Sequence, residues 1–247
     1  GYAAGKNQIV YTRLAADLDT PVSLMLKLTG AAQNAFVLES VTGGEVRGRY
    51  SIIGMKPDLI WRCRGTTSAV NRAARYDADA FEDAAGDPLD TLRALIAESR
   101  IDLPGDLPQA AAGLFGYLGY DMIRLIEHLP NVNPDPLGLP DAMMVRPSVI
   151  AVLDGVKGEV TIVSPAWVSD GQSAKAAYAQ AAERVMDAVR DLERSMPGAS
   201  RDLGEAHEES SPVSNFTRDE YKSAVEKARE YIVAGDIFQV VPSQRWA

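Results

Sequence analysis

The segment "RPSVIAVLDGVKGEVTIVSP", residues 146–165, decides the fold class. It contains two runs rich in β-branched residues, 146–154 and 158–165, which meet across a turn that begins and ends with glycine. Two such runs joined by a short glycine-containing turn are typical of a β-hairpin, in which neighbouring strands run antiparallel. The segment therefore predicts an antiparallel sheet.

Further short strands and interspersed helices surround this hairpin. Glycine, proline and threonine clusters separate the apolar runs and predict turns, among them "GMKP" at 54–57. The expected strands are 8–13, 34–40, 49–54, 58–65 and 67–74. The expected helices are 19–30, 87–99 and 173–196, and a strand followed by a short helix is expected within 110–130. Regular βαβ alternation is missing, so the sequence predicts an α+β fold with a mainly antiparallel sheet and peripheral helices.

The longest expected helix, 173–196, has a candidate buried stripe at helical spacing. Its members are Tyr178, Ala182, Val185, Val189 and Leu192.

The composition changes sharply after residue 196. Residues 197–215 are small, polar and acidic with almost no apolar side chain, which is typical of a flexible linker. The chain is therefore expected to have a first domain at 1–196, a linker at 197–215 and the start of a second domain at 216–247.

The expected second domain opens with a strong helix signal. Thr217 and Glu220 have the spacing of a capping box, Phe216 and Tyr221 that of a hydrophobic staple, and Gly235 is placed to end the helix. The apolar run 237–241 follows at once and reads as a buried strand. One helix and one strand bury too little apolar surface to fold alone, so we expect these residues to be part of a larger domain.

Composition excludes several classes of function. The 247 residues carry a net charge of −9 and 7% aromatic residues, which disfavours a nucleic-acid partner. One cysteine, Cys63, rules out a disulfide within the chain and fits the reducing cytoplasm, where a structural thiol is its default role. No segment has the roughly 20 consecutive apolar residues that a membrane-spanning helix needs.

Two glycine patterns indicate turns or close backbone packing rather than a binding site. Gly43 and Gly48 have the spacing of a phosphate-binding loop, but Arg49 and Tyr50 replace the Lys and Ser or Thr that such a loop needs. We therefore expect a turn there. The triplet spacing in "GLFGYLG", residues 113–119, indicates close backbone packing. No His, Cys, Asp or Glu cluster has metal-ligand spacing, so no metal site is expected within this segment.

Two stretches place polar residues inside apolar runs. Glu39 and Ser40 lie within "FVLESVTGGEVRGRYSIIG", residues 36–54, and Gln239 lies within "AGDIFQVVPSQR", residues 234–245. A buried polar side chain without a partner costs about 1–3 kcal/mol. Each of these residues must therefore bond either to neighbouring backbone or to a ligand.

These stretches resemble anthranilate synthase component I. "LES" at 38–40 and "GRYSIIG" from Gly48 resemble the family's tryptophan feedback site, and "FTRDEYKSAVEKAREYIVAGDIFQVVPSQR" resembles the start of its chorismate-binding domain. The resemblance implies antiparallel sheets packed face to face with helices outside. It also implies that the complete protein converts chorismate and ammonia to anthranilate and pyruvate in the cytoplasm.

The resemblance further implies Mg²⁺ bound by residues beyond 247, a glutamine amidotransferase partner that supplies ammonia, and feedback inhibition by tryptophan. The inhibitor-binding residues it implies are Leu38, Glu39, Ser40, Arg49, Tyr50 and Ser51. Glu39 can pair with the tryptophan ammonium and Ser40 can form a hydrogen bond. Adjacent strand residues point to opposite faces, so Glu39 and Ser40 line one pocket only if the strand breaks or one contact is through backbone.

Gln239 is the expected catalytic-site residue. In the related isochorismate and salicylate synthases, the equivalent strand carries a Lys that activates water. Glutamine is no general base near neutral pH, and this fits ammonia as the nucleophile. Two alternatives stay open, namely the large subunit of aminodeoxychorismate synthase and a non-catalytic module that binds an amino acid.

Overall fold

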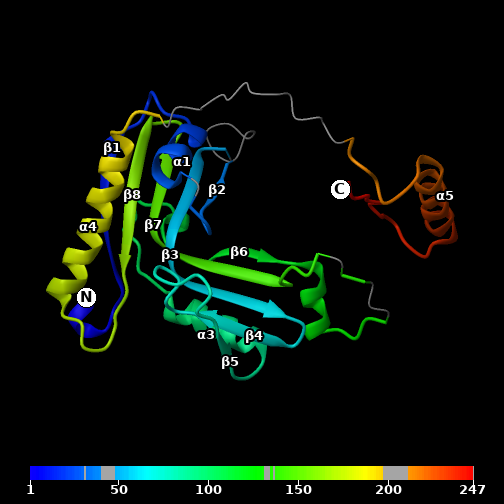
Figure 1. Ribbon diagram of the computed structural model, residues 1–247, viewed down its shortest axis with the longest axis horizontal. Helices are drawn as coiled ribbons and strands as arrows, with labels where there is room; N and C mark the ends of the chain where they lie inside the picture. Colours follow the sequence, from blue (N-terminus) through cyan, green and yellow to red (C-terminus); the bar gives the residue numbers. More distant parts are fainter. Residues whose placement is uncertain (31, 40–47, 131–133, 136, 197–210, 247) are drawn as a thin grey trace. The chain divides into compact units, whose positions relative to one another are not determined.

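The computed structural model describes residues 1–30, 32–39, 48–130, 134–135, 137–196 and 211–246 (Figure 1). They belong to two units, Gly1–Pro197 and Gly198–Ala247. The strands of the first unit are β1 Gln8–Ala15, β2 Phe36–Leu38, β3 Tyr50–Arg64, β4 Thr67–Asn71, β5 Glu82–Ala84, β6 Phe115–Leu118, β7 Ala142–Asp154 and β8 Glu159–Ala166. Its α-helices are α1 Pro21–Thr29, α3 Pro88–Glu98 and α4 Ala174–Leu192, and its 3-10 helices are η1 Tyr2–Ala4, η2 Gln109–Ala111 and η3 Tyr120–Leu125.

The strands of the described residues form one antiparallel sheet around the central pair β3 and β7. In its first half the order is β1-β8-β7-β3-β2, and in its second half it is β6-β7-β3-β4-β5. Figure 1 shows that β3 and β7 change direction between the two halves. The predicted α+β fold with a mainly antiparallel sheet and the predicted hairpin of β7 and β8 are both confirmed.

The change of direction occurs where the sequence predicted a turn. "GMKP" does not separate two strands, because β3 runs through it without interruption. Lys56 has a φ of 51°, and the pairing with β7 shifts register between Pro57 and Leu59. Proline has no N–H to donate to a ladder, and a bulge lets the strand bend while pairing resumes on either side. The expectation of two separate strands was wrong for this reason.

Each half of the sheet has its own apolar core. In the first half, α4 packs on β1 and β8 while α1 packs on α4 and β3, which covers one face (Figure 1). Ile53, Met55 and Val149 point into that layer. The opposite face carries Ile150, Val152 and Val163, which pack with Leu107 and Ala111. The second half buries Leu59, Trp61, Cys63, Leu92, Leu95, Met122 and Ala142 against α3 and η3.

The buried stripe of α4 differs from the predicted one. Ala177, Ala181, Val185 and Ala188 are buried, whereas Tyr178 is largely exposed. Small residues let a helix approach a sheet closely, so the face with most alanine packs inward. The sequence pattern correctly identified Val185, and the predicted Val189 and Leu192 are partly buried against the same core, whereas the predicted Tyr178 and Ala182 are not among the buried residues.

Glycine permits close contact between β6 and β7, as the triplet pattern predicted. A Cβ atom at Gly116 would overlap the carbonyl oxygen of Met143, and one at Gly119 would lie 2.7 Å from the carbonyl oxygen of Asp141. Any larger residue would therefore push the two strands apart.

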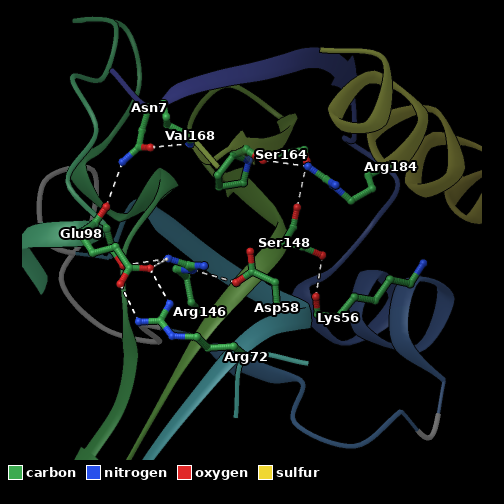
Figure 2. A network of polar contacts seen from close by, with 12 residues as sticks. Asn7, Lys56, Asp58, Arg72, Glu98, Arg146, Ser148, Ser164, Val168 and Arg184 are labelled. Carbon is green, nitrogen blue, oxygen red and sulfur yellow. Dashed lines mark hydrogen bonds and ion pairs between the residues drawn. The ribbon is translucent and has the colours of Figure 1, made fainter. Parts of the chain in front are cut away.

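A polar network lies at the bend of the sheet (Figure 2). Arg146 of β7 donates from Nε to Asp58 Oδ1 at 2.8 Å and from a terminal nitrogen to Glu98 Oε1 at 3.0 Å. Arg72 forms two bonds to the same Glu98 carboxylate, at 2.9 and 2.8 Å. Asp58 occupies the register shift of β3, so the bulge directs its carboxylate toward Arg146.

The second unit contains helix α5, Arg218–Ala234. Thr217 and Glu220 form the predicted capping box, Gly235 ends the helix with a left-handed conformation, and the rings of Phe216 and Tyr221 meet edge to face at 6.4 Å. The predicted strand after α5 is absent, since residues 236–245 have no regular secondary structure. Among the described residues of this unit, strand-type pairing is limited to an isolated bridge between Ser214 and Trp246.

Candidate functional site

The residues expected to bind an amino acid meet where β2 pairs with the start of β3. Leu38 is the register partner of Ile52. Tyr50 and Ser51 precede Ile52 on β3 and pair with the end of β7. The structure therefore brings Leu38 close to the start of β3, although 11 residues lie between Leu38 and Tyr50 in the sequence.

Tyr50 and Ser51 face opposite sides of the sheet. Tyr50 and Ile52 pack in the apolar cluster of Ile150 and Val152. Ile53 points to the other side, into the layer covered by α1 and α4. Because side chains alternate along a strand, Ser51 shares the side of Ile53. One pocket therefore receives only one of these two side chains directly.

Glu39 follows β2 directly and is exposed. Ser40 lies outside the described residues, so its role in ligand binding stays a prediction. Glu39, the acidic residue of the "LES" motif, therefore lies at the end of β2 with its side chain exposed to solvent.

Arg49 holds the start of β3 to the turn between β7 and β8. Its Nε lies 3.0 Å from Asp154 Oδ1, and a terminal nitrogen lies 2.6 Å from Oδ2. Asp154 also accepts hydrogen bonds from the backbone N–H groups of Val156 and Lys157, at 3.1 and 3.2 Å. The hydrogen bonds from Arg49 hold the pKa of the Asp154 carboxyl below its ordinary value. Arg49 thus fixes the start of β3 relative to the end of β7.

Asp154 was not identified from the sequence. Its partner Arg49 lies 105 positions away, and no local pattern links the two. One local signal was present, because Asp154 precedes Gly155 at the predicted turn and Asp often accepts backbone N–H groups at such positions. That signal predicts the contacts to Val156 and Lys157 but not the ion pair.

Gln239 lies in the second unit and is exposed. The predicted buried strand around it, 237–241, was wrong for this structure, and Phe238 is 95% exposed. A strand forms only where a neighbouring strand accepts its backbone hydrogen bonds, and the described residues of this unit provide no such neighbour. The contact of Gln239 with a substrate therefore stays a prediction.

The described residues do not contain a metal centre or a membrane-spanning helix. No group of three or more His, Cys, Asp or Glu is placed to hold a metal ion among them. No helix in the described ranges is long and apolar enough to cross a bilayer. Cys63 is a buried thiol whose pKa is raised by burial, which agrees with a structural role.

Comparison with known proteins identifies the family. A family model described as chorismate binding enzyme matches residues 54–247, which is most of the chain. This chain belongs to the chorismate-binding enzyme family. The match includes β3 from Gly54 onward, β4 to β8 and α5, and it leaves out β1, α1 and β2.

Several curated relatives share the name anthranilate synthase component 1. That of Cereibacter sphaeroides is 72% identical over 247 residues, which is 100% of this chain and 49% of the relative. That of Pseudomonas putida is 36% identical over 98% of this chain and 49% of the relative, and that of Thermus thermophilus is 37% identical over 93% and 45%. The chain spans about half the length of the curated relatives it matches.

A crystal structure of anthranilate synthase component I from Streptococcus pneumoniae has a similar fold. The TM-score is 0.59 at 24% sequence identity, and the match covers 95% of this chain and 48% of that one. This likeness supports the fold, in agreement with the antiparallel sheet described above.

Proposed function

We propose that this chain is part of the large subunit of an anthranilate synthase. The complete protein converts chorismate and ammonia to anthranilate and pyruvate in tryptophan biosynthesis. The observation that carries this proposal is the 72% identity, over every residue of the chain, to a relative named anthranilate synthase component 1. The "LES" and "IFQVVPSQR" segments, on which the resemblance to anthranilate synthase component I rests, support the same proposal.

In this proposal the first unit contributes a tryptophan-binding half-site for feedback inhibition. Leu38 lies close to Tyr50 and Ser51 at one end of the sheet, and Arg49 fixes the start of β3 through its contact with Asp154. Glu39 is exposed and has a carboxylate that can pair with the ammonium of tryptophan.

The partner and cofactor of the complete protein are part of the same proposal. A glutamine amidotransferase subunit supplies ammonia, and the protein works in the cytoplasm, which agrees with its single unpaired cysteine. Mg²⁺ is expected at the chorismate carboxylate in the complete enzyme. The described residues do not fit a magnesium site, so we assign no ligand of the ion to them and expect this chain alone to be inactive.

A growth test separates the three candidate functions. Disruption of the gene that encodes this chain is expected to create a requirement for tryptophan that anthranilate also relieves. A requirement for p-aminobenzoate instead would identify an aminodeoxychorismate synthase. Growth without either supplement would favour a non-catalytic binding module and would contradict the proposal.

Gln239 is proposed to face the chorismate pocket of the complete protein. Lysine at this position can act as a general base after partial desolvation, whereas glutamine cannot. We expect Gln239→Lys in the complete protein to lower amination and to form some hydroxylated product, as measured by chromatography of the products from chorismate. The matched control is Gln33→Lys, a change at an exposed position between α1 and β2. If Gln239→Lys left amination intact with no hydroxylated product, the assignment would be wrong.

A further inference from the structure

A polar cavity lies beside the network at the bend of the sheet. Its volume is about 450 Å³, within the range of small-molecule sites. Every lining residue belongs to the first unit. The residues come from β3, β7 and α4, from the ends of α3 and β8, and from the segments before β1, after β4 and after β8. The cavity is separate from the end of the sheet where Leu38 and Tyr50 lie, because none of the expected tryptophan-binding residues lines it.

The charged lining residues have an excess of positive charge. Three arginines, Arg72, Arg146 and Arg184, face two carboxylates, Asp58 and Glu98. Arg72 and Arg146 share the two carboxylates between them. Three positive and two negative groups leave a net charge of +1, so the cavity attracts one negative charge.

The positive charge that no carboxylate of the lining balances belongs to Arg184. Its Nε donates to Ser164 Oγ at 2.8 Å and a terminal nitrogen donates to the carbonyl oxygen of Pro165 at 2.8 Å, as Figure 2 shows for Ser164. Both acceptors are neutral, and within the described ranges Arg184 forms no ion pair. A guanidinium has five N–H donors, so three remain without a partner among the described residues.

The electrostatic surroundings of Arg184 favour an added anion. Burial lowers the pKa of Arg184, and the nearby charge of Arg75 lowers it further, while Asp58 partly opposes this. Arg184 is partly buried, and an anion held by the N–H groups of a partly desolvated cation offsets part of its desolvation cost.

Trp167 lines the same cavity and has a side-chain donor without a partner in the described part of the chain. Its indole Nε1 is buried and has no hydrogen-bond partner among the described residues. The guanidinium of Arg146 lies 4.5 Å from the centroid of the Trp167 ring, so the indole is held in a fixed position by a cation–π contact. Buried side-chain donors without partners are rare in folded proteins, and each calls for an explanation such as a bound water, an ion or a functional role.

We propose that this cavity binds a small monocarboxylate through the unpaired N–H donors of Arg184 and the indole N–H of Trp167. The fork of guanidinium donors matches the two oxygens of a carboxylate. A single negative charge neutralises the cavity, whereas a phosphate dianion would leave a negative excess beside Asp58 and Glu98. The neighbouring amides of Gln172 and Gln180 offer further polar contacts to the remainder of the ligand.

The test uses the ¹⁵N-labelled chain and the three tryptophan indole N–H signals of its NMR spectrum. Trp167→Phe identifies the signal of Trp167. Acetate, benzoate, phosphate and chloride are titrated at constant ionic strength and pH 7. We expect acetate or benzoate to shift the Trp167 signal in a saturable way, while the Trp61 signal, whose Nε1 already donates to Thr91 Oγ1 at 3.1 Å, stays in place.

Arg184→Gln is expected to weaken the carboxylate affinity about tenfold or more, since a charged hydrogen-bond partner is lost. The matched control is Arg190→Gln, an exposed arginine on the same helix, which should bind as the unaltered chain does. The titration of the unaltered chain decides the proposal even if Arg184→Gln does not fold. No saturable shift of Trp167 with either carboxylate, a response to phosphate alone, or an equal response to chloride would overturn it.

Discussion

Strand β7 and residues 237–241 both read as strands in the sequence, but only β7 is one. β7 pairs with β3 along its length and with β6 and β8 at its ends, and nearly all of its residues are buried. The segment 237–241 has four apolar residues in five, yet it has no strand partner among the described residues and Phe238 is 95% exposed. An apolar, β-branched run thus indicates a strand only when another strand is there to pair with it.

Helix α5, which precedes residues 237–241, forms as predicted because the residues that start and end it act locally. The capping box of Thr217 and Glu220 and the left-handed Gly235 form without any tertiary partner. No residue of α5 is buried, so the helix in this chain depends on its caps and its exposed charge pairs. The first unit is held together by pairing between strands that are far apart in the sequence, whereas residues 237–241 have no such pairing within the described part of the chain. Substitutions are therefore expected to change the free energy of unfolding strongly in the first unit and weakly in residues 237–241.

The largest effect is expected at Arg146, which joins β7 to Asp58 and Glu98. Arg146→Leu leaves the Asp58 carboxylate without its cation, and breaking this partly buried pair is expected to cost about 2–3 kcal/mol of unfolding free energy. Urea denaturation followed by tryptophan fluorescence measures the change. Arg93→Leu removes an exposed pair on α3 and should cost less than about 0.5 kcal/mol. Equal losses from both variants would show that the network does not stabilise the bend.

A matched pair of phenylalanines measures the difference between the units directly. Phe115 of β6 packs on Phe36, with ring centroids 4.9 Å apart, whereas Phe238 is almost fully exposed. We expect Phe115→Ser to lower the unfolding free energy of the first unit by about 2 kcal/mol and Phe238→Ser to change it by less than about 0.5 kcal/mol. A loss from Phe238→Ser comparable to that from Phe115→Ser would mean that residues 237–241 are packed.

A smaller, pH-dependent effect is expected at Asp154. Its pKa is lowered in the folded state by Arg49, so its stabilising contribution is present above the unfolded pKa of about 3.9 and is lost as the pH falls through the folded value. Asp154→Asn should cost about 1–2 kcal/mol at pH 7 and less near pH 3. Urea denaturation between pH 7 and pH 3 measures both values, with Asp90→Asn, an exposed residue of α3, as the control. A loss that does not change with pH would exclude the ion pair as its cause.

Much of the fold was predictable because its signals are local. The hairpin of β7 and β8 follows from its turn, and α1, α3 and α5 begin at residues whose side chains cap them, namely Thr20, Asp87 and Thr217. The bend of β3 was not predictable, because "GMKP" resembles a turn and only pairing with β7 on both sides of Pro57 keeps the strand intact. The bend directs the Asp58 carboxylate toward Arg146, so the sequence did not predict this ion pair either.

The candidate site was predictable only in part. Pairing of β2 with β3 brings Leu38 close to the start of β3, while the binding of tryptophan by these residues stays a prediction. The partner of Arg49 and the cavity beside Arg184 depend on residues far apart in the sequence, whose distances are fixed by the sheet order. Long-range polar pairs of this kind have no periodic pattern, and a single sequence does not identify them.

Hydrogen–deuterium exchange of the 247-residue chain, resolved by residue, tests the contrast between the units most directly. Amides of β3, β7 and β8 should exchange only through global unfolding of the first unit, because they are paired and buried. Amides 237–241 should exchange near the rate of an unstructured peptide. Strong protection of residues 237–241 would contradict the account, because it would show that this segment pairs as a strand in the isolated chain.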